Sequence, residues 1–178
     1  MYLRLSPDEE SIKDIFVSFF DAECSIERVR NAEESGFDAT AWERFIETGG
    51  PGMCLPESCG GGGADLTTAA IVANLLGTYV APIPFIEHVV AARLLASLDE
   101  SNANLPLLTT GEMIGSLALQ SLHDSTSAIV PAGAIANYII GLRGEEIVVA
   151  ENTTGASALR NTANLPIARH NFDDAIVV

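Results

Sequence analysis

The chain of 178 residues is 48% hydrophobic and 19% charged, a balance typical of a folded globular protein rather than a disordered one. Its length suits one large domain or two small ones. Aspartate and glutamate outnumber lysine and arginine by 24 to 9, which gives a formal net charge of −15. A surface this acidic repels phosphate, so we expect neither a nucleic-acid partner nor binding to an anionic membrane.

The first ten residues carry acidic side chains and lack the apolar stretch of a secretory signal. The apolar stretches elsewhere are too short to span a bilayer, so no membrane insertion is expected. The three cysteines, Cys24, Cys54 and Cys59, are interpreted as reduced thiols of a cytoplasmic protein. A zinc half-site at Cys54 and Cys59 is the alternative. It would lack the further nitrogen or sulfur ligands of a zinc centre, and no metal is expected.

The first predicted helix begins at Ser6, which is followed by Pro7 and Glu9. Ser6 and Glu9 have the spacing of a capping box, and proline fits the first helical turn. Apolar side chains then follow at the i, i+3, i+4, i+7 and i+8 positions of one face: Ile12, Ile15, Phe16, Phe19 and Phe20. This spacing predicts a helix with one buried stripe.

Two more helices are predicted before a long loop. The first covers residues 25–34 and stops at Gly36, and the second runs from Asp38 to Gly49. Residues 51–64 are dense in glycine and proline and are predicted to form the loop.

The next predicted helix is capped by Asp65 and extends to about Tyr79. It has almost no polar face, which predicts a central helix that is packed on several sides. Pro82 and Pro84 then break the chain, and a further helix is expected over residues 85–98.

After residue 102 the pattern changes to short apolar runs separated by Gly, Asn, Thr and Pro, at residues 117–119, 139–140, 146–150 and 175–178. Such runs are typical of strands and turns. The predicted fold class is therefore α+β: an all-α helical domain over residues 1–105, followed by a small β-domain over residues 106–178.

Four consecutive glycines at 60–63 precede a predicted helix and invite interpretation as a phosphate-binding loop. No Lys-Ser/Thr pair follows them, no strand precedes them, and Asp65 would place a carboxylate where the phosphate belongs. A tight loop with positive φ at several glycines is the better interpretation.

Several motifs occur in a fixed order in the helical half: Trp42-Glu43-Arg44-Phe45, Gly49, Leu55-Pro56-Glu57, Gly60-Gly61-Gly62-Gly63-Ala64-Asp65 and Leu75-Leu76-Gly77. This order resembles the N-terminal helical domain of acyl-CoA dehydrogenases, in which Trp, Gly, Pro-Glu, Gly-Gly, Asp and Leu-Gly follow one another. The Pro-Glu and Gly-Gly elements in that order are the more specific part of the pattern.

The β half resembles the same family. Residues 129–138 are similar to its Trp-Ile-Thr-Asn-Gly-x-x-Ala-Asn/Asp strand and turn, and residues 155–157 and 172–177 are similar to the closing strands of its middle domain. The resemblance covers nearly the whole chain. It implies a helical bundle, a β-barrel-like middle domain and, in a complete enzyme, a second helical bundle.

The resemblance also implies FAD as the cofactor. The residues that would contact it by position are Leu119, Gln120, Ser121, Ile129, Val130 and Pro131. Where the family usually reads Thr-Glu-Pro, this chain reads Gln120-Ser121-Leu122-His123, and Ile129 takes the place of the flavin-stacking aromatic residue. The stretch 121–129 is too short for the strand that the family places there, so a shortened barrel with an altered flavin edge is expected.

Acyl-CoA dehydrogenases oxidise acyl-CoA thioesters to trans-2-enoyl-CoA in lipid degradation, with a carboxylate as the base for the α-proton. The family's base lies on the second helical bundle, and no carboxylate of this chain matches its motif, so no catalytic residue is assigned. Glu57 belongs to the resembling loop and is expected to be structural. The acidic balance suits polyanionic CoA poorly unless local arginines or another segment supply positive charge.

We therefore expect the N-terminal and middle part of an FAD-dependent acyl-CoA dehydrogenase, inactive alone, with acyl-CoA as the substrate of the complete enzyme and a homo- or hetero-oligomeric assembly. The alternatives are a non-catalytic subunit of a heteromeric acyl-CoA dehydrogenase and a flavin-free interaction module. His88, His123 and His170 follow no metal-ligand spacing, and packing or surface roles are expected for them.

Overall fold

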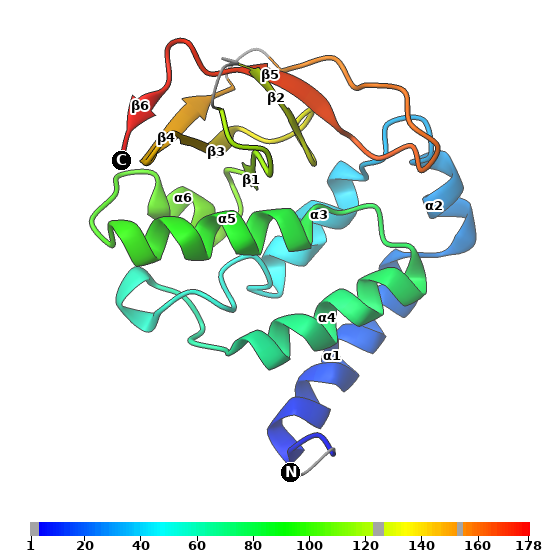
Figure 1. Ribbon diagram of the computed structural model, residues 1–178. Coiled ribbons are helices and arrows are strands. Elements are labelled where there is room, and N and C mark those ends of the chain that lie inside the picture. Colours follow the sequence, from blue (N-terminus) through cyan, green and yellow to red (C-terminus); the bar gives the residue numbers. More distant parts are fainter. Residues whose placement is uncertain (1–3, 123–126, 153–154) are drawn as a thin grey trace.

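The computed structural model describes residues 4–122, 127–152 and 155–178, and Figure 1 shows helices in the first part of the chain and strands in the last. The helical elements are α1 (Pro7–Glu23), α2 (Ile26–Asn31), α3 (Ala39–Glu47), the short 3₁₀ helix η1 (Glu57–Cys59), α4 (Leu66–Tyr79), α5 (Phe85–Leu98) and α6 (Leu105–Thr110). The predicted α+β class is confirmed.

The strands are β1 (Gly115–Leu117), β2 (Ser127–Val130), β3 (Tyr138–Arg143), β4 (Glu146–Glu151), β5 (Ala168–Asn171) and β6 (Ile176–Val177). They form a four-stranded sheet in the order β1-β3-β4-β6 and a two-stranded sheet of β2 and β5. The β1–β3 pair is parallel, and the other pairs are antiparallel. The described strands thus make two open sheets, which corrects the barrel-like expectation: the edge strands β1 and β6 pair on one side only, and both are too short to close the sheet.

The predicted helix starts are confirmed by their caps. The backbone N–H of Glu9 donates to Ser6 Oγ at 3.2 Å, and the N–H of Ser6 donates to the Glu9 carboxylate at 2.6 Å. Asp38 caps α3 and Asp65 caps α4 through side-chain hydrogen bonds of 3.0 and 2.9 Å. The helix expected over residues 25–34 is shorter, because α2 ends at Asn31 and gives way to a turn.

Helix α4 differs from its prediction. Its buried residues, Thr68, Val72 and Leu75, lie on one stripe, and Leu66 on the opposite side is 63% exposed. In Figure 1, α1 and α4 lie side by side at the bottom of the molecule, so α4 is covered mainly from one side. The helix is apolar on faces that nothing in the described chain covers, and the prediction of a central helix is therefore wrong.

Helix α6 was not predicted, because its six residues follow a stretch that resembles turn sequence. Leu105 and Leu108 bury its inner face, and Gly111 ends it in a left-handed conformation. The first strand begins at Gly115, more than ten residues beyond residue 102, where the sequence pattern changes. A domain boundary at residue 105 stays a prediction.

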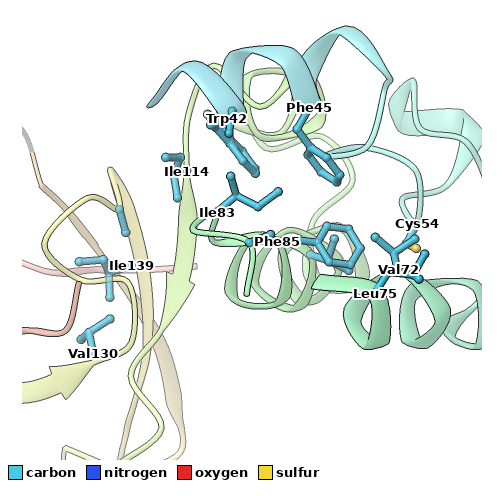
Figure 2. Close-up of a cluster of buried hydrophobic side chains, with 14 of the residues drawn as sticks. Trp42, Phe45, Cys54, Val72, Leu75, Ile83, Phe85, Ile114, Val130 and Ile139 are labelled. Carbon is cyan, nitrogen blue, oxygen red and sulfur yellow. The ribbon is translucent and has the colours of Figure 1, made fainter. Parts of the chain in front are cut away.

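The main core is continuous from the helices to the strands. Figure 2 shows Trp42 and Phe45 of α3 facing Ile83, which precedes α5, and Phe85, the first residue of α5. Ile139 of β3 lies on the far side. Phe45 packs edge-on against Phe85 with ring centroids 5.4 Å apart. A second cluster, which includes Leu95, Leu105, Tyr138 and Ile140, joins α5 and α6 to β3. These contacts hold the segments around the site in place.

Candidate active site

A cavity of about 720 Å³ lies where four separate segments meet. Its walls come from the end of α2 and the following turn, the α4–α5 connection, the turn after β2 and the chain before β5. In Figure 1 the chain before β5, drawn in orange, comes down beside α2. The volume is within the range of small-molecule sites, about 300–1,000 Å³.

Backbone strain is concentrated on this cavity. The described chain has three residues other than glycine with positive φ, namely Val80, Ala132 and Asn164, with φ of 50°, 51° and 49°. All three line the cavity. A left-handed backbone costs Val80 and Ala132 about 1–2 kcal/mol each, whereas asparagine adopts it more readily. Such strain gathers at functional sites, where surrounding structure holds it in place.

Most of the cavity wall is apolar, and its charged side chains are Arg30, Glu33 and Glu87. Arg30 and Glu33 are exposed, whereas Glu87 is half-buried in the first turn of α5. Burial raises the pKa of the Glu87 carboxyl above its usual value. None of the ion pairs within the described residues includes Glu87.

The structure separates the six residues predicted to contact FAD. Leu119, Gln120 and Ser121 follow β1 and are exposed, Leu119 by 76%. The Ser121 hydroxyl donates weakly to Leu142 O at 3.4 Å. These residues do not line the large cavity, and their role stays a prediction.

The other three predicted residues lie at the end of β2. Ile129 is 39% exposed, Val130 is completely buried and Pro131 lines the cavity. Val130 could therefore offer a cofactor only its backbone. The Ser116 hydroxyl of β1 donates to the Pro131 carbonyl, which ties this turn to the larger sheet.

The hydrogen-bond donors that follow β1 fit the polar edge of a flavin. The neighbouring amides of Ala118 and Leu122 donate to β3 residues Ile140 and Leu142 at 2.8 Å, whereas the amides between them, at 119–121, are used in no hydrogen bond of the described structure. Three successive free amides, the Gln120 side chain and an exposed Leu119 could bind a flat heterocycle with polar edges.

The glycine run is not such a site. The amides of Gly60, Gly61, Gly62 and Gly63 donate to carbonyls of the same loop at 2.8–3.1 Å, so none is left for a phosphate. Gly60 and Gly63 have positive φ. The interpretation as a tight loop is confirmed.

Cysteines and histidines form no metal centre in the described residues: no group of three or more His, Cys, Asp and Glu side chains is close enough to hold an ion. Cys24, Cys54 and Cys59 are free thiols, and burial raises the pKa of Cys24 to about 11. His88 and His170 are buried, as the packing role requires, and His123 lies outside the described residues.

Comparison with known proteins decides the family. The model of the acyl-CoA dehydrogenase N-terminal domain matches residues 6–104, more than half of the chain. The chain belongs to the acyl-CoA dehydrogenase family. A curated family member, acyl-CoA dehydrogenase IpdE2 of Mycolicibacterium smegmatis, is 29% identical over 146 residues, which cover 80% of this chain and 45% of the relative. The chain thus spans about half the length of that curated acyl-CoA dehydrogenase.

Solved structures share the fold. One chain of the ChsE4–ChsE5 complex from Mycobacterium tuberculosis superposes on this chain with a TM-score of 0.85 at 19% identity. The match covers 100% of this chain and 57% of the chain in the complex. An acyl-CoA dehydrogenase from Bacillus anthracis complexed with FAD superposes with a TM-score of 0.75 at 19% identity. That match covers 97% of this chain and 37% of the B. anthracis chain. None of the described helices of our acyl-CoA dehydrogenase chain has the length and apolarity to cross a membrane.

Sequence reasoning missed Glu87 and the chain before β5 as parts of the cavity wall. A signal for Glu87 was present: it and Arg93 are the only charged residues in the apolar helix α5. No such signal marked residues 162–167, because their place on the cavity depends on how the β-domain folds back toward α2.

Proposed function

We propose that this chain forms the helical and middle-domain walls of an FAD-dependent acyl-CoA dehydrogenase, which oxidises an acyl-CoA thioester between its α and β carbons. The observation that carries this proposal is the strained, apolar cavity of about 720 Å³ between the α4–α5 connection and the Pro131 turn. Helical segments and the connections between strands both contribute to it, as a cleft between two domains requires. The acyl group is its proposed occupant.

Leu119, Gln120, Ser121, Ile129, Val130 and Pro131 are proposed to hold the flavin, through their backbone groups, the Gln120 amide and the exposed apolar surfaces of Leu119 and Ile129. FAD, when bound, supplies the hydride acceptor. The chain supplies position and polarity, and the apolar walls of the cavity exclude water from the acyl group. Arg30, exposed on the cavity wall, is proposed to offer positive charge to the CoA end of the substrate.

The carboxylate that accepts the α-proton is proposed to come from another segment or subunit, so that the chain alone is inactive. An α-proton beside a thioester is weakly acidic, and its removal needs a base placed within hydrogen-bond range. The three free thiols suit a reducing compartment, which supports a cytoplasmic location.

An FAD titration with and without candidate partner subunits tests this proposal. We expect the flavin absorbance band to change on binding in the presence of the correct partner, and an acyl-CoA to bleach that band only in the complex. Ile129→Asp should weaken FAD binding about tenfold or more, because it places a charge against the flavin face.

Ile176→Asp is the matched control, because Ile176 is also an exposed strand isoleucine, 63% exposed on β6, and has no predicted flavin contact. It should leave FAD affinity within about twofold of wild type. A chain that stays colourless with FAD and with every partner that it binds would contradict the proposal and favour a flavin-free interaction module.

A non-catalytic subunit of a heteromeric acyl-CoA dehydrogenase is the second candidate. Ile86, Val90 and Leu98 make an exposed apolar stripe along α5, each 45–48% exposed. A stripe of this kind favours a protein partner. The ChsE4–ChsE5 match is to a complex of two named components, which supports a heteromer by analogy of fold.

Sedimentation of the chain alone and mixed with a full-length family member separates these candidates. Self-association of the chain alone, abolished by Val90→Asp, would place α5 in an interface. A complex that turns over acyl-CoA while Ile129→Asp leaves the rate and the flavin content unchanged would assign this chain the non-catalytic role.

A further inference from the structure

Ser116 of β1 is completely buried although its side chain is polar. Its neighbours Gly115 and Leu117 face the helices. A Cβ on Gly115 would lie 3.0 Å from the Ala91 side chain of α5, and Leu117 packs against the cluster that joins α5 and α6 to β3. Because successive side chains of a strand point to opposite faces, Ser116 points away from the helices. Its hydroxyl donates to the carbonyl oxygen of Pro131, which directly follows β2.

This hydrogen bond links two sheets that share no strand pairing in the described residues. Strand β1 belongs to the four-stranded sheet and β2 to the two-stranded one. Side-chain contacts and connecting segments therefore set the distance between the two sheets. A buried hydroxyl costs free energy unless it forms a hydrogen bond, and the partner here is the carbonyl of Pro131. Ser116 thus ties the two sheets together at one defined point.

The Pro131 carbonyl belongs to a turn with a strained backbone, because the next residue, Ala132, has a φ of 51°. On the side of β5, the ring of His170 lies 2.6 Å from Gly133 O in the same turn. On the side of β1, the contact comes from Ser116. A strained backbone persists only where the surrounding structure holds it. Loss of the Ser116 hydroxyl should therefore release the turn on the side of β1.

We infer that Ser116 is a positioning residue for FAD: its hydroxyl fixes the Pro131 turn relative to the chain after β1 and so aligns the two halves of the proposed flavin site. This inference rests on the proposed function. One half, residues 119–121, begins three residues beyond Ser116 on the same segment, and the other, residues 129–131, ends at the carbonyl that Ser116 contacts. A site whose parts are already aligned binds more tightly, because the ligand does not have to select that arrangement.

FAD affinity is the first readout. The full chain, mixed with a partner subunit that supports FAD binding, is titrated with FAD while the flavin fluorescence is followed. We expect Ser116→Ala to weaken binding roughly fivefold or more, which is the shift in an equilibrium that one hydrogen bond of ordinary strength produces. Ser116→Cys keeps the size of the side chain and a weaker donor, so its affinity should lie between those of wild type and Ser116→Ala. Circular dichroism checks folding, and Ser116→Cys alone carries the test if Ser116→Ala does not fold.

Hydrogen exchange of the chain without FAD is the second readout, because it reports on the turn itself. The amides of residues 133–136 all donate to backbone carbonyls, so they are protected while the turn is in place. In Ser116→Ala, a peptide covering residues 132–137 should exchange about fivefold faster or more.

Thr109→Val is the matched control. The Thr109 hydroxyl also donates to a backbone carbonyl, that of Leu105 at 2.8 Å, but it lies in α6, outside both halves of the proposed flavin site. Distant sites act independently, so this variant should keep FAD affinity and exchange of the turn within about twofold of wild type.

Wild-type FAD affinity in Ser116→Ala, unchanged exchange of its turn, or an equal loss of affinity in Thr109→Val would each overturn the inference. The first of these outcomes removes only the role of Ser116 and leaves the proposed function in place. If wild type binds no FAD with any partner, the proposed function and the flavin role of Ser116 are both wrong. The exchange measurement still shows in that case whether the hydroxyl holds the turn.

Discussion

His88 Nδ1 accepts a hydrogen bond of 3.2 Å from the backbone N–H of Gly115, so that one buried side chain of α5 fixes the first residue of β1. Its other ring nitrogen lies 3.0 Å from the carbonyl oxygen of Leu108 in α6. An amide can only donate and a carbonyl can only accept, so the proton is on Nε2 and the ring is neutral. Helices and strands meet at this imidazole.

The neutral state of His88 makes the stability of the protein depend on pH. Burial lowers the pKa of His88 to about 4, whereas an unfolded chain has a histidine pKa of about 6.5. Between these values the unfolded state binds a proton that the folded state does not, so stability present above pH 6.5 is lost as the pH falls towards 4. Urea unfolding should show a loss of about 2 kcal/mol by pH 5 that His88→Gln lacks.

The comparison with His88→Gln isolates this histidine, because every carboxylate is common to both proteins. Gln is uncharged throughout this range, so its curve reports only the remaining groups. Parallel stability curves for wild type and His88→Gln between pH 7.5 and 5 would show that protonation of His88 does not oppose folding.

Trp42 forms a second link between distant parts of the chain, since its indole N–H donates to Gly111 O at 3.0 Å. Its ring packs against Phe45 and, edge-on, against His88. Trp42→Ala should lower the free energy of unfolding by about 3–5 kcal/mol, because it removes a large buried side chain and leaves a cavity. Chemical denaturation measures this change.

Glu43→Ala on the same helix is the control, because the Glu43 side chain is exposed and lies outside the core. This substitution should change stability by less than about 0.5 kcal/mol. If Trp42→Ala cost less than about 1 kcal/mol, the indole would not be an anchor of the core.

The helices were predictable because local chemistry fixes them. Ser6, Asp38 and Asp65 each mark a helix start by a side chain that meets a free amide three residues on, and the structure uses all three. The spacing that placed Phe16 and Phe20 on one face is local in the same way. Periodicity and capping depend on neighbours within one or two turns, which a sequence displays directly.

The strand pairing and the candidate site were less predictable because they depend on distant segments. Strand β5 pairs with β2 across more than 30 residues, and nothing near Ala168 signals that partner. That the described strands form two open sheets and no closed barrel depends on the same distant pairings. Pro131, which the resemblance assigned to FAD, lines the cavity, and its contact with FAD stays a prediction. Glu87 and Asn164 join Pro131 there only through tertiary folding.

Asp38 is expected to stabilise the protein in two ways that substitution can separate. One carboxylate oxygen accepts from the Ala41 N–H at 3.0 Å and caps α3, and the other accepts from the Arg28 guanidinium at 3.0 Å. Asp38→Asn keeps the cap and loses the charge pair, so it should cost about 0.5–1 kcal/mol. Asp38→Ala loses both and should cost about 1–2 kcal/mol more.

Thermal or urea unfolding of the two variants, at low and high salt, measures these contributions. The difference between Asp38→Asn and wild type should shrink in salt because Arg28 is partly exposed, and the difference between Ala and Asn should not. Equal stability of the two variants would mean that Asp38 acts only through its charge.

The last prediction concerns two Gly→Ala substitutions, one in the glycine loop and one in α4, that change stability in opposite directions. A Cβ on Gly61 would lie 2.4 Å from Leu55 O, within a loop whose amides are already bonded to their own carbonyls, so the backbone would have to move. We expect Gly61→Ala to destabilise the protein by about 2 kcal/mol or more. A methyl group added at Gly77 in α4 would have no neighbour within 4 Å, and Gly77→Ala should stabilise the protein by about 0.5–1 kcal/mol through helix propensity. Urea unfolding of both variants checks the signs, and a neutral Gly61→Ala would show that the loop can shift without cost.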